Sequence, residues 1–238
     1  MAGQKRRGVG RPNENVLSRV LIVETALDLL DRHGRDGFGM REIAHELGVR
    51  PSALYNHVSS KDDVFQGIRE VIATRITVAP FATQRWDEAL RTWARSYREV
   101  FASHPPTIAL LAVMPFATDS EIFTTYEQVI EALHREGWER SEALNILVAM
   151  ESFILGSALD AAAPDDLMSP GDRGDIPQFS EAYAQRATRT TETGVSPADQ
   201  AFESGLDVFM MGLRAQRDAR AGVGHSSTAL SASSPPSG

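Results

Sequence analysis

Residues Phe38 to Lys61 read FGMREIAHELGVRPSALYNHVSSK, and this segment contains the strongest structural signal in the chain. Its apolar residues recur at helical spacing on both sides of a glycine: Ile43, Ala44, Leu47, then Leu54 and Val58. Gly48 permits a sharp turn between the two segments, and Pro51 suits the first turn of the second. The pattern predicts a helix-turn-helix over about residues 39–58.

The sequence on either side predicts two longer helices that complete this unit. Ser18 is a suitable N-cap for a helix with a regular apolar face, made of Ile22, Ala26, Leu29 and Leu30. Gly34 ends this helix, since glycine adopts the left-handed cap conformation at little cost. Ser60 and Asp63 resemble a capping box at the start of the other helix.

The outward face of the second short helix has the chemistry needed to read a DNA groove. Asn56 can pair with adenine through two hydrogen bonds, and small apolar side chains can contact a thymine methyl. Tyr55, His57 and Lys61 are better placed for phosphates. The candidate DNA-binding residues are Arg41, Arg50, Pro51, Ser52, Ala53, Tyr55, Asn56, His57 and Lys61.

The charge is divided unevenly along the chain of 238 residues, although the net charge is −8. Residues 1–61 have a balance of +3 and residues 62–238 a balance of −11, which suggests a nucleic-acid contact at one end only. Residues 1–17 are expected to form a disordered basic tail, in which Arg6, Arg7 and Arg11 either enter a minor groove or attract phosphates without specificity. Residues 219–238 are Ser-, Ala-, Gly- and Pro-rich and are predicted to be a disordered tail.

The remaining periodicity is helical, so the predicted fold class is all-α. The expected helices span residues 85–103, 106–113, 120–136, 141–163, 178–190 and 197–218. We expect a DNA-binding domain over 18–65 and a second helical domain over 66–218. The chain has no cysteine, and its longest apolar run, 108–117, is too short to span a membrane, which predicts a cytoplasmic protein.

The segment from Ser18 to Lys61 resembles the DNA-binding domain of the TetR (tetracycline-repressor) family of transcription regulators. The family pattern Leu-Tyr-x-His-apolar, followed by lysine, is present here as Leu54-Tyr55-Asn56-His57-Val58 and Lys61. Weaker matches continue through Trp86–Pro164 and the segment Phe202–Asp207. Two positions depart from the family, because Gly39 and Arg50 replace the usual capping residues before the two short helices.

The resemblance implies a dimer with a ligand cavity in each subunit. The helices near 141–163 and 197–218 would form a four-helix bundle with their copies across a twofold axis. The former is apolar almost all round, although Glu151 and Asp160 argue against a membrane. The candidate ligand-binding residues are Trp93, Tyr97, His104, Met114, Phe123, Tyr126 and Met150, and they suggest an uncharged or weakly polar, largely apolar effector.

The family's metal-bound drug is not expected here, because Leu110 or Leu111 lies where the tetracycline repressor has its histidine ligand. We predict no cofactor, no metal and no catalytic site, since no known catalytic motif is present and His45-Glu46 lacks the second histidine of a zinc motif. The expected function is a homodimeric repressor that binds a palindromic operator and is released by a small molecule. An activator or a ligand-dependent DNA binder of the same architecture remains open, as does an α-helical binding protein or enzyme with a degenerate N-terminal domain.

Overall fold

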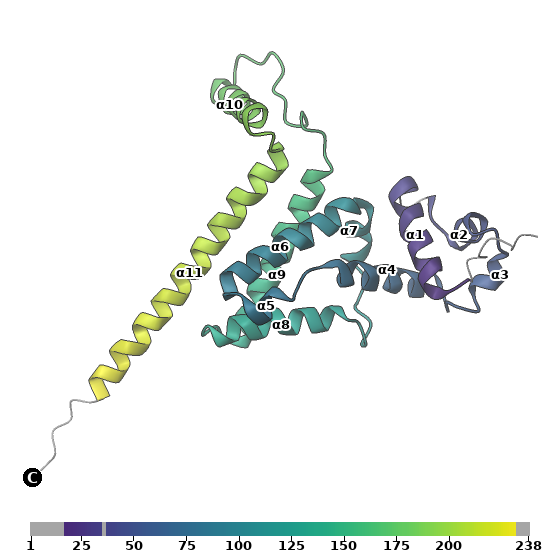
Figure 1. Cartoon of the computed structure of the whole chain (residues 1–238). Helices are drawn as coiled ribbons and strands as arrows, with labels where there is room; N and C mark the ends of the chain where they lie inside the picture. The colour runs from purple at the N-terminus through teal and green to yellow at the C-terminus, as the bar shows by residue number, and fades with distance from the viewer. Residues whose placement is uncertain (1–16, 35–36, 232–238) are drawn as a thin grey trace, which may run out of the picture. The chain divides into compact units, whose positions relative to one another are not determined.

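A computed structural model describes residues 17–34 and 37–231, with side chains as far as Arg220. The regular structure in these residues is helical and contains no strand, as predicted (Figure 1). The helices are α1 (Arg19–His33), α2 (Met40–Glu46), α3 (Pro51–Leu54), α4 (Lys61–Arg75), α5 (Pro80–Thr83), α6 (Trp86–Ser103), α7 (Pro105–Leu111), α8 (Ile122–Arg135), α9 (Arg140–Ala161), α10 (Pro177–Thr193) and α11 (Pro197–Ser231).

The chain forms two compact units, which divide between Ile68 and Arg69. The division falls inside α4, so the first half of this helix belongs to the N-terminal unit and the second half to the C-terminal unit. The sequence predicts this boundary between residues 65 and 66.

The helix ends of the N-terminal unit form through local hydrogen bonds that the sequence predicts. The Ser18 hydroxyl accepts from the Leu21 N–H at 3.2 Å, and the Ser60 hydroxyl accepts from the Asp63 N–H at 3.1 Å. The Asp63 carboxylate reaches back to the N–H of Ser59, at 2.8 Å, rather than to that of Ser60. Gly48 has a φ of +66° between α2 and α3, a conformation that a side chain would strain.

The core of the N-terminal unit is formed where α1 meets the helix-turn-helix and the start of α4. Its most deeply buried large side chains are Ile22, Leu30, Ile43, Leu54 and Ile68. Gly67 lets α1 and α4 approach closely, because a Cβ at this position would lie 2.5 Å from Cγ2 of Val23. This pair is therefore a point of steric contact that leaves no room for a methyl group.

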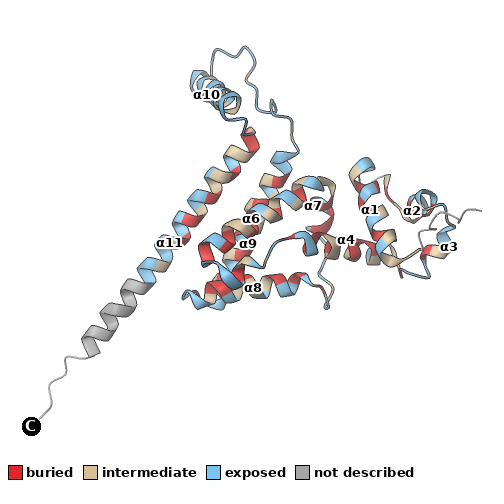
Figure 2. Ribbon diagram, in the orientation of Figure 1, coloured by how far each residue is buried: buried red, intermediate tan, exposed pale blue. Residues whose placement is uncertain are grey.

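Helix α9 forms the centre of the C-terminal unit and packs against α6, α7, α8 and α11. One stripe along it is fully buried and repeats at helical spacing: Ala143, Leu147, Met150, Ile154 and Ala158. Figure 2 shows this helix with buried and exposed residues alternating around it. By length and composition α9 is apolar enough to cross a membrane, but a core helix meets the same test, so this is weak evidence of a membrane span.

Helix α11 packs on α9 through an aromatic cluster. The Phe153 ring stacks on Phe202 with centroids 5.5 Å apart and lies 5.8 Å from Phe209. Gly205 makes room for it, since a Cβ there would lie 2.6 Å from Phe153 Cε2. The chain therefore needs a residue without a side chain where the two helices approach.

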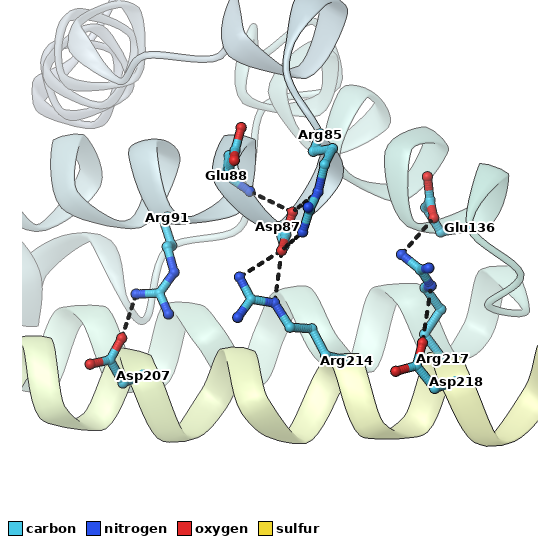
Figure 3. A network of polar contacts seen from close by, with 9 residues as sticks. All are labelled: Arg85, Asp87, Glu88, Arg91, Glu136, Asp207, Arg214, Arg217 and Asp218. Atoms are coloured by element: carbon cyan, nitrogen blue, oxygen red, sulfur yellow. Dashed lines mark hydrogen bonds and ion pairs between the residues drawn. The ribbon is translucent and has the colours of Figure 1, made fainter.

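A series of ion pairs fixes α11 along α6. Figure 3 shows the pairs near the start of α6, made by Asp87 and Arg91. Three arginines of α6 pair with three acids of α11: Arg91 with Asp207, Arg95 with Glu203, and Arg98 with Asp199. At the end of the series the charges are reversed, because Asp87 of α6 accepts from Arg214 of α11 at 2.8 Å. The paired residues are three, four or seven positions apart on each helix, so they lie on one face of it. Residue numbers rise along α6 as they fall along α11, so the two helices run antiparallel.

Two features differ from the sequence prediction. Helix α11 does not end at residue 218 but continues to Ser231, so the tail predicted to begin at Ala219 is helical in its first part. The segment 219–231 contains no proline to interrupt the helix, and alanine favours it. The structure also contains the short helix α5, which starts with Pro80 at its first turn.

We predict that Gly67→Ala destabilises the N-terminal unit by about 1–3 kcal/mol, because the new methyl group overlaps Val23. Urea unfolding of the wild type, Gly67→Ala, Val23→Ala and the double variant measures this. The double variant should be more stable than the sum of the two single effects, since Val23→Ala removes the overlapping atoms. Strict additivity would contradict the steric explanation.

We also predict that the stability contribution of Asp87 depends on pH. Burial alone raises the pKa of this carboxyl, but hydrogen bonds from Arg85 and Arg214 outweigh it and hold the pKa below its usual value. The carboxylate therefore stabilises the fold above its ordinary pKa of about 4, and this contribution is lost as the pH falls through the lowered value.

The variant Asp87→Asn should lose about 1–3 kcal/mol of unfolding free energy at pH 7 and progressively less below pH about 4. Thermal unfolding across this range measures the difference. Asp175→Asn is the matched control, because Asp175 pairs with Arg173 on the exposed surface. A constant difference between wild type and Asp87→Asn at all pH values would show that the ion pair is not the cause.

Candidate nucleic-acid interface and ligand cavity

The candidate DNA-reading residues lie on an exposed surface around α3. Pro51, Ser52, Asn56 and His57 are exposed, and the Tyr55 side chain is 53% exposed. Leu54 is fully buried beneath them and anchors the segment to the core. Helix α3 itself ends at Leu54, but the N–H groups of His57 and Val58 still donate to the Leu54 carbonyl, at 2.9 and 3.1 Å. The segment therefore presents its polar side chains from a short, hydrogen-bonded turn.

The first turns of α2 and α3 begin without a side-chain cap. The two N-cap positions are occupied by Gly39, which has no side chain, and by Arg50, whose side chain does not bond to the helix backbone. The first N–H groups of α2 and α3 therefore have no side-chain acceptor at the N-cap position. Arg41 and Arg50 are exposed, whereas Ala53 is half-buried.

Lys61 has a structural contact that the sequence did not reveal. Its ammonium donates to the Phe38 carbonyl at 3.0 Å and lies over the rings of Phe38 and Phe65, 5.0 and 5.3 Å from their centroids. The residue is half-buried, so its charge also holds the loop before α2 against α4. Arg6, Arg7 and Arg11 lie outside the described residues.

The C-terminal unit contains a cavity of about 330 Å³. Side chains from five helices, α4, α6, α7, α8 and α9, and from the segment after α7 line it. Most of its wall is aliphatic or aromatic, including Ile72, Phe101, Ile108, Leu111 and Phe116. A cavity of this kind suits a small organic molecule with a largely apolar body.

A cluster of three polar groups interrupts the apolar wall. Tyr97 from α6 and Tyr126 from α8 both donate to the same oxygen, Oε1, of Glu151 on α9, the former at 2.7 Å. Burial raises the pKa of Glu151, against the lowering effect of these two hydrogen bonds. Burial and the neighbouring carboxylate also raise the pKa of both tyrosines, so their hydroxyls remain donors at neutral pH.

Arg69 is the second charged residue in the wall of the cavity, and its side chain is hydrogen-bonded to the protein backbone. Its guanidinium donates to the carbonyls of Leu111, Met114 and Pro115 at 2.7–2.9 Å and stacks over Phe116, 4.5 Å from the ring centroid. Burial lowers its pKa. The residue thus ties the segment after α7 to α4, two elements that both line the cavity.

The structure brings together only some of the candidate ligand-binding residues. Tyr97, Met114 and Tyr126 line the cavity. Trp93 and Met150 do not, because both are completely buried in the core, and the indole N–H of Trp93 has no acceptor among the described residues. The indole N–H of Trp93 is therefore buried in the core and does not face the cavity.

His104 and Phe123 also lie outside the lining. His104 forms the junction between α6 and α7, where its Nε2 is 2.8 Å from the Arg75 guanidinium, and the Phe123 ring packs on Phe116 and is 46% exposed. Glu151 and Arg69 also line the cavity, and neither was among the predicted ligand-binding residues. For Glu151 the sequence signal is an acid inside an otherwise apolar helix.

The described residues contain no group of three or more His, Asp or Glu side chains that could hold a metal ion. Leu110 and Leu111, one of which is expected from the resemblance to lie where the tetracycline repressor has its histidine ligand, are both buried, and their side chains have no atom that could bind a metal.

Comparisons with known proteins match both units. Residues 22–68 match the model for bacterial regulatory proteins of the tetR family, and residues 79–217 match the tetracyclin repressor-like C-terminal domain. The chain is 30% identical over 200 residues to the tetracycline repressor protein class A from transposon 1721 of Escherichia coli, which covers 82% of this chain and 90% of that protein.

Solved structures show the same fold. A variant of TetR from Acinetobacter baumannii AYE in complex with minocycline aligns with a TM-score of 0.69 at 25% identity, over 84% of this chain and 95% of that one. Apo ActR from Streptomyces coelicolor aligns with a TM-score of 0.66 at 23% identity, over 86% of this chain and 98% of that one. The exposed reading segment and the cavity thus lie in two domains of known type.

Proposed function

Because this chain belongs to the TetR family and is a DNA-binding transcriptional regulator, we propose that it acts as a homodimeric repressor of a palindromic operator. A molecule bound in the cavity of residues 69–155 releases it from DNA. The observation that carries the proposal is the exposed reading segment of residues 51–57, which is anchored by a fully buried Leu54.

The DNA contacts follow from the exposed groups. Asn56 reads a base edge, while Tyr55 and His57 bind phosphates on either side of it. Arg41 and Arg50 contribute positive charge, and the backbone around Pro51, Ser52 and Ala53 approaches the groove. Lys61 has free N–H bonds beyond its contact with Phe38 and adds a phosphate contact at the start of α4.

The proposed dimer uses an apolar surface of α9 and α11 that the monomer leaves exposed. Leu144, Val148 and Leu159 on α9 are 45–51% exposed, and Val208 and Met211 on α11 are 64–67% exposed. Ala149, Ser152, Gly156 and Ala215 are small exposed residues on the same two helices. Large exposed apolar side chains beside small ones suit close packing between helices, and a second copy supplies a matching surface about a twofold axis.

A dimer also explains why one short reading segment is enough. Two recognition segments related by a twofold axis read two half-sites about 34–36 Å apart, which doubles the sequence information. The ion pairs between α6 and α11 then have a functional consequence, since they fix α11 in the position that the interface requires.

Helix α4 is the proposed coupling element, because it takes part in both units. Val64, Phe65 and Ile68 belong to the core of the N-terminal unit, whereas Arg69 and Ile72 line the cavity. A ligand that shifts the second half of this rigid helix changes the separation of the two reading segments. Coupling of about 1–3 kcal/mol, typical of such systems, changes DNA affinity 5- to 150-fold.

The alternative is the opposite sign of control, in which the ligand-bound form binds DNA and the protein activates transcription or needs its ligand to bind. The DNA affinity of the ligand-free protein distinguishes the two, because tight binding without ligand supports repression. TetR regulators are generally non-enzymatic. We propose that this chain is a cytoplasmic protein that binds DNA without a cofactor. Its proposed domains are residues 18–65 and residues 66–218.

We predict that Tyr55→Ala weakens binding to every duplex by about tenfold, whereas Asn56→Ala relaxes the preference at one base pair. The first change removes a phosphate contact and the second a base contact, which is worth about 1–3 kcal/mol of discrimination. Mobility-shift titrations with duplexes selected by the wild type from a random pool measure both effects.

Val20→Ala is the control for these variants, because Val20 is an equally exposed residue of the same unit outside the helix-turn-helix. Wild-type affinity of Tyr55→Ala across the selected duplexes would rule out residues 51–57 as the reading segment.

We predict that the double variant Val208→Glu/Met211→Glu is monomeric at micromolar concentration, because it places two carboxylates in the proposed apolar interface. Sedimentation velocity measures the oligomeric state. Leu167→Glu is the control, since Leu167 is 67% exposed on the loop before α10, away from this surface. The control should remain a dimer, and a double variant that also remains a dimer would place the interface elsewhere.

A further inference from the structure

We infer that the cavity of residues 69–155 takes a ligand with a basic nitrogen on an apolar body, and that Glu151 binds this nitrogen. The inference specifies the ligand of the cavity and therefore rests on the proposed ligand control.

The first argument is that Glu151 has unused bonding capacity. Both tyrosine hydroxyls donate to Oε1, so that oxygen is occupied. The described part of the chain gives Oε2 no hydrogen bond, and no lysine, arginine or histidine there lies within ion-pair distance of Glu151. A carboxylate can accept about four hydrogen bonds, so at least the second oxygen is available to a ligand.

The second argument concerns the other charge in the wall. Arg69 does not neutralise Glu151, because its guanidinium is directed at the carbonyls of Leu111, Met114 and Pro115 and covered by Phe116. These carbonyls and the aromatic ring already supply the partial negative charge that a buried arginine needs. The cavity thus has a cation with its acceptors in place and a carboxylate without a cation.

The third argument is the medium around the carboxylate. Phe101, Ile108, Leu111 and Ile122 make the rest of the wall apolar, and burying an uncompensated carboxylate among such side chains is unfavourable. A protonated amine supplies the missing charge and an N–H donor in one group. The rings of Tyr97 and Tyr126 beside it can add cation–π attraction.

These arguments change the ligand class expected from the sequence. The apolar wall fits the predicted largely apolar body, but Glu151 adds a specific requirement for a positive, donating group. An anionic ligand of the same shape would meet the carboxylate directly and be repelled.

Three probes with one carbon skeleton test the inference: 4-phenylbutylamine, 4-phenylbutan-1-ol and 4-phenylbutyric acid. They place an ammonium, a hydroxyl or a carboxylate on the same apolar body. Isothermal titration calorimetry with the full-length protein at pH 7 should show the amine binding about 10- to 100-fold more tightly than the alcohol, with the acid weaker still.

The variant Glu151→Gln keeps the size of the side chain and an acceptor oxygen for the two tyrosines, but it loses the charge. We expect the preference for the amine over the alcohol to fall to about one, while binding of the alcohol changes little. Glu142→Gln is the matched control on the same helix, because Glu142 pairs with Arg220 outside the cavity and should leave the preference intact.

Equal binding of amine and alcohol to the wild type, or an amine preference that survives Glu151→Gln, overturns the inference. Tightest binding of the acid also overturns it, since Glu151 would then carry a proton and act as a donor. Failure of the whole regulatory proposal looks different. In a mobility-shift assay, an amine that binds through Glu151 without changing DNA affinity leaves this inference intact and contradicts the proposed ligand control.

Discussion

The packing of α9 is the constraint on which the rest of the C-terminal unit depends. Its buried stripe from Ala143 to Ala158 contacts helices on several sides, and α6, α8 and α11 each bury part of their apolar faces against it. The same helix turns Glu151 towards the cavity and Leu144 and Leu159 towards solvent. Core, ligand site and proposed dimer surface are thus three faces of one helix, and a rotation of α9 would disturb all of them.

Close approach is achieved where a side chain is absent. Gly205 admits the Phe153 ring between α9 and α11, and Gly67 admits Val23 between α4 and α1. The ion pairs along α6 and α11 act differently, since most of their members are half-exposed and each contributes little alone. Together they favour one register, because a shift of about two turns along α11 would replace Arg214 by Asp207 opposite Asp87 and place two carboxylates side by side.

The cavity combines two charged residues with different tasks. Arg69 donates hydrogen bonds to backbone carbonyls at the end of α7 and after it, so its role is structural. Glu151 is held by two tyrosines at one oxygen and has the other available. In such a cavity the apolar wall favours binding of an apolar body, and a polar group with free acceptor capacity selects among ligands.

The helical class, the helix-turn-helix, the caps at Ser18 and Ser60 on the two flanking helices, and the exposed face around Tyr55 and Asn56 could all be predicted from the sequence. These features are local: spacing, capping and glycine conformation act within a few residues, so one stretch of sequence contains the whole signal. Only the tertiary structure decided which polar residues share the cavity. Trp93 and His104 appeared as good candidates as Tyr97 in sequence, yet helix packing turned the first into the core and the second towards Arg75. Glu151 meets Tyr97 across 54 positions of the chain and Tyr126 across 25, and contacts over such separations depend on how three helices pack, which periodicity within one helix does not specify.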